Sequence, residues 1–302
     1  MAFTKVHHVG MVARDLEEAR RLYCDGFGLR VDEYRSLLPD GRLDEQWGAN
    51  VLEFPIGEMS IWVMKPTASN TAAGRFLAAR GGVGAMHHLA VQSDDIGRDV
   101  STLESKGLRK MAPPQTVWNG KGPLFFQPAT TLGLVLSVWP DERYFPNPAY
   151  AGEGIFTGMG HVGMVASDTE EARRFWGDVW GLTQDHSKTR AASDNVRIIE
   201  FIIGGSIIEI SVPQDTVSGT ARFLAQRGSL GATFHHICPW APDVHRAVER
   251  GKAIGLQQIG DIAPREVSRR ATAWFHPRSC LGTLMEIWNR PANEQQAREE
   301  RR

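Results

Sequence analysis

The chain has 302 residues, 42% of them hydrophobic and 23% charged, so it can bury the cores of two domains of ordinary size. Its formal net charge of -1 gives no reason to expect nucleic acid or an anionic membrane surface as a partner. The three cysteines have no zinc or disulfide spacing, and the first ten residues have no apolar signal region, so we expect a cytoplasmic protein. Charges interrupt the most apolar stretch, so we expect no membrane span.

The two halves of the chain repeat the same blocks in the same order. The run His8-Val-Gly-Met-Val-Ala returns as His161-Val-Gly-Met-Val-Ala, and the blocks at Arg75, Met86 and Leu132 return later with nearly the same offset. Such a repeat predicts a duplicated domain. We expect domains at 1–140 and 157–290, joined by a linker at 141–156 and followed by a charged tail at 291–302.

The second copy shows the expected elements most clearly in chain order. A strand at 160–166 leads into Asp168-Thr-Glu-Glu171, an acidic helix start with capping-box spacing, and the helix ends at Gly181. Strand-like segments follow, and the pattern restarts near Phe234 with a strand, a helix and two more strands. Strands that come in runs between helices favour an α+β fold, with a curved, mostly antiparallel sheet and helices on its outer face.

Four polar residues of the second copy occupy the same place in successive strand-helix modules, each on a different strand. Alternation along a strand places each of them opposite an apolar, helix-covered side. Four strands of one curved sheet can therefore aim two imidazoles and two carboxylates into a single concavity. Buried carboxylates repel one another and lose hydration, and a divalent cation offsets both costs. The sequence thus predicts a metal site whose ligands are His161, Glu209, His236 and Glu286.

The first copy lacks half of this ligand set. His8 and His88 match the two histidines, whereas Trp62 stands in the place of Glu209 and Ser137 in the place of Glu286. Two neutral histidines without carboxylates make a poor site for a hard divalent ion. We therefore expect a metal-free first domain with a structural role. The alternatives are that it walls the pocket or holds substrate through Trp62.

Six segments of the second copy carry a resemblance to a known family: His161-Val-Gly-Met, 208–213, 222–228, 234–237, 275–279 and 282–286. At these residues the chain resembles the vicinal oxygen chelate superfamily of glyoxalases, methylmalonyl-CoA epimerases, extradiol dioxygenases and bleomycin-resistance proteins, and the second copy is most similar to the epimerases. The resemblance implies tandem glyoxalase-type domains. Each would be two βαβββ modules that form a mixed, mostly antiparallel cup, and in the second domain the cup would surround the metal.

One segment departs from the epimerase pattern. Epimerases of this type carry Glu-Gln-Gly before the strand that here begins at Val196, and that glutamate serves as a catalytic base. Here the segment reads Ser193-Asp-Asn195, so Asp194 is a candidate replacement, beside Glu209 and Glu286, for proton transfer. Four further residues are candidates for contact with the substrate: Arg197, Arg269, Trp274 and His276. For each of them the alternative is a solvated position or a packing role.

The ligand set indicates a reaction class. A divalent ion acts as a Lewis acid that stabilises the enolate of a neighbouring carbonyl, while a carboxylate moves the proton. The leading hypothesis is therefore a metal-dependent epimerase, isomerase or glyoxalase-type lyase that acts on a small carbonyl or thioester. An Fe(II) extradiol-type ring-cleaving dioxygenase is one alternative, but that chemistry needs two histidines and one carboxylate, so coordination by Glu209 would count against it. A non-catalytic small-molecule binding protein is the other.

The cofactor and partners follow from the same reasoning. Mixed nitrogen and oxygen ligands admit one divalent ion among Mn, Fe, Co, Ni, Zn and Mg. The expected partner is a small molecule with two neighbouring oxygens, and we expect neither nucleic acid nor a membrane. Because the fusion can replace a dimer of single domains, we expect a monomer or a homodimer.

Overall fold

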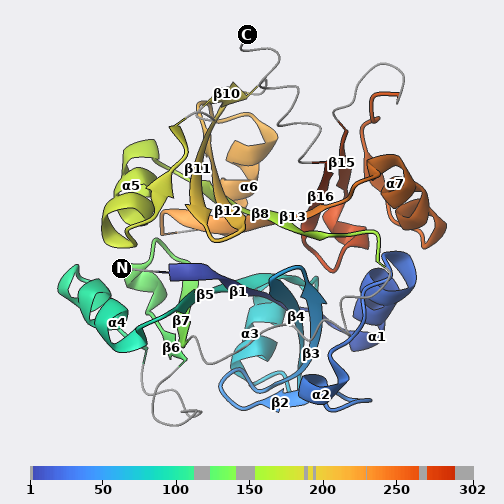
Figure 1. Cartoon of the computed structure of the whole chain (residues 1–302), viewed down its shortest axis with the longest axis horizontal. Coiled ribbons are helices and arrows are strands. Elements are labelled where there is room, and N and C mark those ends of the chain that lie inside the picture. The colour runs from blue at the N-terminus through green and yellow to red at the C-terminus, as the bar shows by residue number, and fades with distance from the viewer. Residues whose placement is uncertain are drawn as a thin grey trace. The chain divides into compact units, whose positions relative to one another are not determined.

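The computed structural model describes residues 3–111, 123–140, 154–186, 190–192, 195–228, 230–264 and 271–289. Within these residues the strands form two sheets, and each sheet is built from one sequence repeat (Figure 1). The sheets are mixed, with helices outside them, which confirms the α+β fold expected from the sequence. No helix among the described residues is both long and apolar enough to cross a bilayer.

The first sheet has seven strands in the order β2-β3-β4-β1-β5-β7-β6. The strands are β1 (Phe3–Val12), β2 (Arg42–Asp44), β3 (Ala49–Ile56), β4 (Met59–Pro66), β5 (Ala85–Ser93), β6 (Leu124–Phe125) and β7 (Val135–Pro140). The helices of this repeat are α1 (Leu16–Arg20), which continues as the π-helix η1 (Arg21–Gly26), α2 (Glu33–Ser36), α3 (Ala72–Ala79), α4 (Ile96–Ser105) and the 3-10 turn η2 (Pro128–Thr130).

The second sheet has nine strands in the order β10-β11-β12-β8-β13-β16-β15-β14, with β9 also paired to β11. The strands are β8 (Gly158–Ala166), β9 (Thr183–Gln184), β10 (Arg190–Ala192), β11 (Val196–Ile203), β12 (Ser206–Pro213), β13 (Ala232–Trp240), β14 (Gln258–Ile259), β15 (Thr272–Phe275) and β16 (Leu284–Trp288). The helices are α5 (Thr169–Arg173), which continues as the π-helix η4 (Arg174–Val179), α6 (Gly219–Arg227), α7 (Val244–Ala253) and the 3-10 turn η6 (Pro277–Ser279).

Aspartate begins one helix in each of the four strand-helix modules. Asp15, Asp95, Asp168 and Asp243 are the N-caps of α1, α4, α5 and α7, and each side chain accepts a hydrogen bond from a backbone N–H of the first turn. The carboxylate also offsets the positive end of the helix dipole. The Asp168 cap, whose Oδ1 lies 2.7 Å from the Glu171 amide nitrogen, confirms the predicted helix start.

Helices of the second repeat cover one face of its sheet and leave the other to the site. α5 packs against β11, α6 against β12, and α7 against β15 and β16 (Figure 1). Apolar side chains on the covered side, such as Ile208 and Ile210 of β12, are completely buried. Because side chains alternate along a strand, Glu209 between them faces the opposite side.

Packing contacts group the chain into two compact units, and each unit takes segments from both repeats. One unit comprises Met1–Val9, His87–Tyr144 and His161–His235, and the other comprises Gly10–Met86, Phe145–Gly160 and His236–Arg302. In the first, the Trp180 ring lies 5.2 Å from the ring of Phe3 and 6.0 Å from that of Phe126, centroid to centroid. In the second, the Phe27 ring lies 4.6 Å from that of Phe156 and 6.5 Å from that of Phe275. Each core therefore mixes side chains from the two halves of the sequence.

Candidate metal centre

Four neighbouring strands of the second sheet each contribute one candidate ligand. In the order β12, β8, β13 and β16, these residues are Glu209, His161, His236 and Glu286. The strand register shows that they share a face: Gly163, two residues after His161, pairs with Glu209, while Leu284, two residues before Glu286, pairs with His236. All four side chains are buried. The structure thus brings the predicted ligands to one side of the sheet.

The ligands form two close histidine-carboxylate pairs. His161 Nε2 lies 3.8 Å from Glu209 Oε2, and His236 Nε2 lies 3.4 Å from Glu286 Oε2. One nitrogen or carboxylate oxygen from each of His161, Glu209 and His236 lies within 4.8 Å of the others. Metal bonds to nitrogen and oxygen of 2.0–2.2 Å allow two ligand atoms to lie roughly 4.4 Å apart at most. Both pair distances meet this limit, so each pair could bind a divalent ion, and His161 belongs to a three-residue group with Glu209 and His236.

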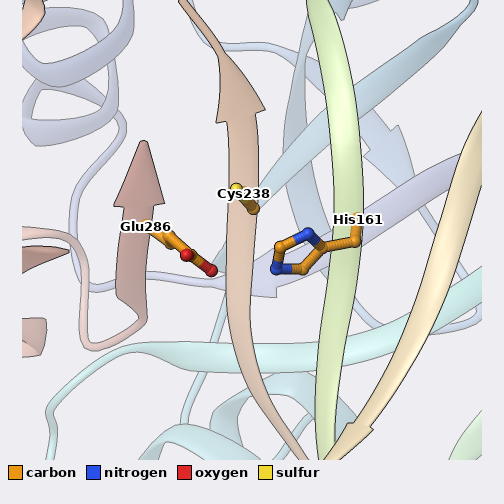
Figure 2. Close-up of side chains that lie close together, drawn as sticks. All are labelled: His161, Cys238 and Glu286. Atoms are coloured by element: carbon orange, nitrogen blue, oxygen red, sulfur yellow. The ribbon is translucent and has the colours of Figure 1, made fainter. Parts of the chain in front are cut away.

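A cysteine belongs to the same cluster, although the sequence analysis did not single it out. Cys238 is completely buried on β13, two residues after His236, and its sulfur lies within 4.8 Å of ligand atoms of His161 and Glu286. Figure 2 shows the Glu286 carboxylate and the His161 ring pointing toward each other from the strands on either side of Cys238. The alternation rule that selected Glu209 would also have selected Cys238, because residues two apart on a strand share a face.

A further carboxylate on this face was also missed. Glu200 of β11 pairs directly with Glu209 of β12, so their side chains lie on the same side of the sheet, and Glu200 is buried. The signal was available only once the hairpin register was known. The second copy therefore places three glutamates on the face that carries the two candidate histidines.

The remaining predicted site residues separate into two groups. Trp274 of β15 pairs with Glu286, and its ring centroid lies 5.3 Å from that of His236, so it joins the cluster. The half-buried His276 accepts a hydrogen bond at Nδ1 from the Arg278 amide, 3.1 Å away, and thereby caps η6.

Arg197 is exposed, and alternation from Glu200 puts its side chain on the opposite face, so the structure does not bring it to the cluster. Asp194 and Arg269 lie outside the described residues.

In the first repeat, the matching histidines bond to each other. His8 Nε2 lies 2.9 Å from His88 Nε2. On the far side of each ring, His8 Nδ1 lies 2.6 Å from His7 Nδ1, and His88 Nδ1 lies 3.0 Å from His87 Nδ1. All four rings are buried. A neutral imidazole offers one donor and one acceptor, so His8 and His88 each use both ring nitrogens within this row. Burial and, secondarily, the neighbouring His87 lower the pKa of His88 well below 6.5, which favours the neutral form of this ring.

The other two positions of the first repeat are also occupied by internal contacts. The Arg42 guanidinium carbon lies 4.9 Å from the ring centroid of Trp62, the counterpart of Glu209, and Arg42 Nη2 lies 3.1 Å from Glu53 Oε1. Ser137, the counterpart of Glu286, accepts a hydrogen bond at Oγ from Trp139 Nε1 at 3.2 Å. The positions that match the metal ligands therefore carry two histidines bonded to each other, a tryptophan that contacts an arginine, and a serine.

Both halves of the chain match one known family. A model of the glyoxalase/bleomycin resistance protein/dioxygenase superfamily matches residues 5–130, and a second model of the same description matches residues 160–272. The chain belongs to this superfamily. The second match ends before β16, so the assignment of Glu286 rests on the repeat and on the geometry.

Relatives of this superfamily show where the closer similarities lie. The mitochondrial methylmalonyl-CoA epimerases of Mus musculus and Bos taurus are each 25% identical over 135 residues, which cover 44% of this chain and 71% and 73% of theirs. These matches fall in the first half of the chain, so the closer likeness of the second copy to the epimerases remains a prediction.

Two solved structures share the fold across nearly the whole chain. A mutant of 4-hydroxymandelate synthase from Streptomyces coelicolor has a TM-score of 0.65 at 14% identity and covers 95% of this chain and 92% of its own. The halotolerant catechol dioxygenase BphC has a TM-score of 0.59 at 15% identity, with coverage of 95% and 87%. At this identity the likeness extends to the tandem fold alone.

Proposed function

We propose that the chain is a divalent-metal-dependent enzyme that forms an enolate or related oxyanion from a small carbonyl or thioester substrate. The reaction would be an epimerisation, an isomerisation or a glyoxalase-type lyase step. The observation that carries this proposal is the pair of buried histidine-carboxylate contacts, His161–Glu209 and His236–Glu286, on neighbouring strands of one sheet. Burying carboxylates on a shared face costs free energy, and a divalent cation bound between them would offset that cost.

The chain's residues would divide the work between binding and proton transfer. His161, His236, Glu209 and Glu286 would hold the ion, which supplies Lewis acidity toward a substrate oxyanion when bound. Glu200 shares the face but is not needed as a ligand, so we assign proton transfer to it. Its carboxylate would take the proton from the carbon next to the carbonyl, and both electrons of the C–H bond would remain on the substrate as an enolate. Donation of a proton by a second acid to the opposite side of that carbon would invert the centre.

A ring-cleaving dioxygenase is the second candidate. His161, Glu209 and His236 form a group of two histidines and one carboxylate, which is the ligand type of Fe(II) oxygenases. The Glu286 carboxylate, 3.4 Å from His236, argues for a fourth protein ligand and hence against this chemistry. The two candidates differ in their reagents, because only the dioxygenase consumes oxygen.

The test compares two measurements on metal-loaded protein. Small α-carbonyl acids and thioesters are incubated in D2O with the protein loaded with Mn²⁺, Co²⁺ or Zn²⁺, and NMR follows exchange of the α-hydrogen. Oxygen uptake is measured separately with the Fe²⁺-loaded protein and simple catechols. We expect metal-dependent deuterium exchange without oxygen uptake. Oxygen uptake without deuterium exchange would replace the first candidate function with the second. A protein that binds no metal and shows neither activity would exclude both functions.

A pair of variants separates the two roles. Glu200→Gln removes the proposed base while keeping the size of the side chain, so deuterium exchange should fall by roughly 100-fold while metal content stays the same. Glu209→Gln should lower metal content as well. Loss of metal in both variants would assign Glu200 to the ligand set, and full exchange activity in Glu200→Gln would remove it from the reaction.

A further inference from the structure

Cys238 supplies the observation that the proposed nitrogen and oxygen ligands do not explain. Its side chain is completely buried, and its sulfur, one nitrogen of His161 and one carboxylate oxygen of Glu286 all lie within 4.8 Å of one another. The sulfur lies 4.0 Å from the carbonyl oxygen of Pro239. His161 belongs both to this group and to the one with Glu209 and His236, so the two groups adjoin at one imidazole.

The position of Cys238 on its strand suits a ligand. His236 and Cys238 are two residues apart on β13, so their side chains project from the same face with origins about 6.6 Å apart along the strand. A long imidazole and a short thiolate can reach a common ion from these two positions, because metal–sulfur bonds of about 2.3 Å are slightly longer than metal–nitrogen bonds. In Figure 2, Cys238 lies on the strand between the strands of His161 and Glu286.

The rest of the chain supplies two comparisons. The residue of the first repeat that corresponds to Cys238 is Ala90, on β5 two residues after His88, in the copy that lacks the carboxylate ligands. Cys280 is also buried, and burial raises its pKa to about 12, so it remains a neutral thiol. Of the described cysteines, Cys238 is the one that the structure groups with imidazole and carboxylate ligands.

We propose that Cys238 is a metal ligand that makes the centre selective for thiophilic divalent ions. Zn²⁺, Co²⁺, Ni²⁺ and Fe²⁺ accept thiolate ligands, whereas Mg²⁺ and Mn²⁺ favour carboxylate, carbonyl and water. This inference rests on the proposed function, because it assumes that the second repeat binds an ion. It narrows the choice of ion from the six admitted by nitrogen and oxygen ligands to these four.

Cobalt spectroscopy tests the ligand directly and without activity. The metal-free full-length protein is titrated with Co²⁺, equilibrium dialysis measures the bound ion, and absorption is recorded in the visible range, where bound Co²⁺ absorbs, and in the near ultraviolet, where a cobalt–thiolate bond gives charge transfer. We expect about one bound Co²⁺ with both absorptions in the wild type. Cys238→Ala should lose the ultraviolet band, and Cys280→Ala, the buried control, should keep it.

Competition experiments test selectivity in the same variants. Cys238→Ala should bind Zn²⁺ at least about tenfold more weakly, while its affinity for Mn²⁺ stays the same. Ala90 shows that a small side chain is accommodated at the matching strand position, and circular dichroism checks the fold of the variant. X-ray absorption on the Zn²⁺-loaded wild type needs no variant, and a zinc–sulfur shell there supports the same ligand.

The outcomes separate the ligand from the site. Bound Co²⁺ with visible absorption but no thiolate band, or Zn²⁺ without a sulfur shell, overturns the role of Cys238 and leaves the nitrogen and oxygen centre standing. A thiolate band that survives in Cys238→Ala and disappears in Cys280→Ala also overturns it. No bound Co²⁺ in the wild type overturns the proposed metal centre together with this inference.

Discussion

Individual side chains distinguish the two repeats as candidate metal sites. The same strand positions carry Glu209 and Glu286 in the second repeat but Trp62 and Ser137 in the first. In the first repeat, the histidines satisfy each other, and Arg42 already neutralises Glu53. The first repeat therefore offers no carboxylate at either of these two positions. The difference between the copies is therefore electrostatic, because their backbones follow the same strand pattern.

Replacing the matching residues in the two repeats tests this assignment. Glu286→Ala removes a buried carboxylate ligand and should weaken Co²⁺ or Zn²⁺ binding by roughly 100-fold or more. Ser137→Ala removes a hydroxyl whose partner is the Trp139 ring nitrogen, so metal binding should not change. Isothermal titration calorimetry of both variants measures the affinities. Equal losses would mean that the second repeat alone does not form the site.

The buried histidine row makes stability depend on pH. The pKa of His88 lies well below 6.5 in the folded state, whereas in the unfolded chain it returns to about 6.5. Below that pH the unfolded state binds more protons, so the free energy of unfolding falls as the pH falls, by up to about 1.4 kcal/mol per pH unit for this group. Urea denaturation between pH about 7.5 and about 5.5 measures the slope.

His88→Gln isolates this contribution. The variant should be less stable near neutral pH but should lose less stability on acidification than the wild type, because the titrating imidazole is gone. His186→Gln, at an exposed position, is the control and should retain the wild-type slope. Identical slopes for all three proteins would show that His88 titrates normally in the fold.

At the scale of elements, close backbone packing positions the strand that carries Glu286. Gly282, two residues before β16, has a φ of +75°, and an added Cβ would lie 1.5 Å from the carbonyl oxygen of Gly84. Both features require glycine, since left-handed backbone is unfavourable for other residues and the neighbouring backbone cannot shift freely. The entry into β16 is therefore held by contact with the first repeat.

A matched pair of glycines separates the two causes. Gly282→Ala should lower the free energy of unfolding by about 2–4 kcal/mol, because it combines backbone strain with a steric clash. Gly81→Ala has a similar φ of +67° with nothing within 4 Å of an added Cβ, so only the strain of about 1 kcal/mol applies. Urea denaturation of the two variants measures the difference. A Gly282→Ala variant as stable as Gly81→Ala would show that the loop relaxes.

At the scale of the whole molecule, the repeats are interdependent, although each forms its own sheet. Trp180 is completely buried, and its aromatic neighbours Phe3 and Phe126 come from the other half of the chain. Phe27 and Phe275 make a corresponding contact in the second packing unit. Separating the halves would expose these aromatic side chains to water, and large exposed apolar patches promote association.

Expression of the halves tests this interdependence. Residues 1–156 and 157–302 produced separately should aggregate or self-associate, whereas the two produced together should form a soluble complex with the sedimentation behaviour of the intact chain. Analytical ultracentrifugation of the three samples makes the comparison. Stable monomers of both halves, each with a cooperative thermal transition, would contradict it.

Local patterns in the sequence accounted for much of the fold and for the strand face on which the candidate ligands lie. The repeat predicted the duplication, the Asp168 cap predicted a helix start, and period-two alternation put His161 and Glu209 on one face of a sheet. These inferences succeed because caps and strand faces depend on residues within a few positions of one another.

Only the tertiary structure decided which strands are neighbours and what the two copies share. The placement of Glu200 beside Glu209 required the hairpin register, and the grouping of Cys238 with Glu286 required the pairing of β13 with β16. The histidine row and the mixed cores likewise join residues far apart in the chain. Such contacts arise from hydrogen bonding and apolar burial between distant segments, and periodicity within one segment carries no information about them.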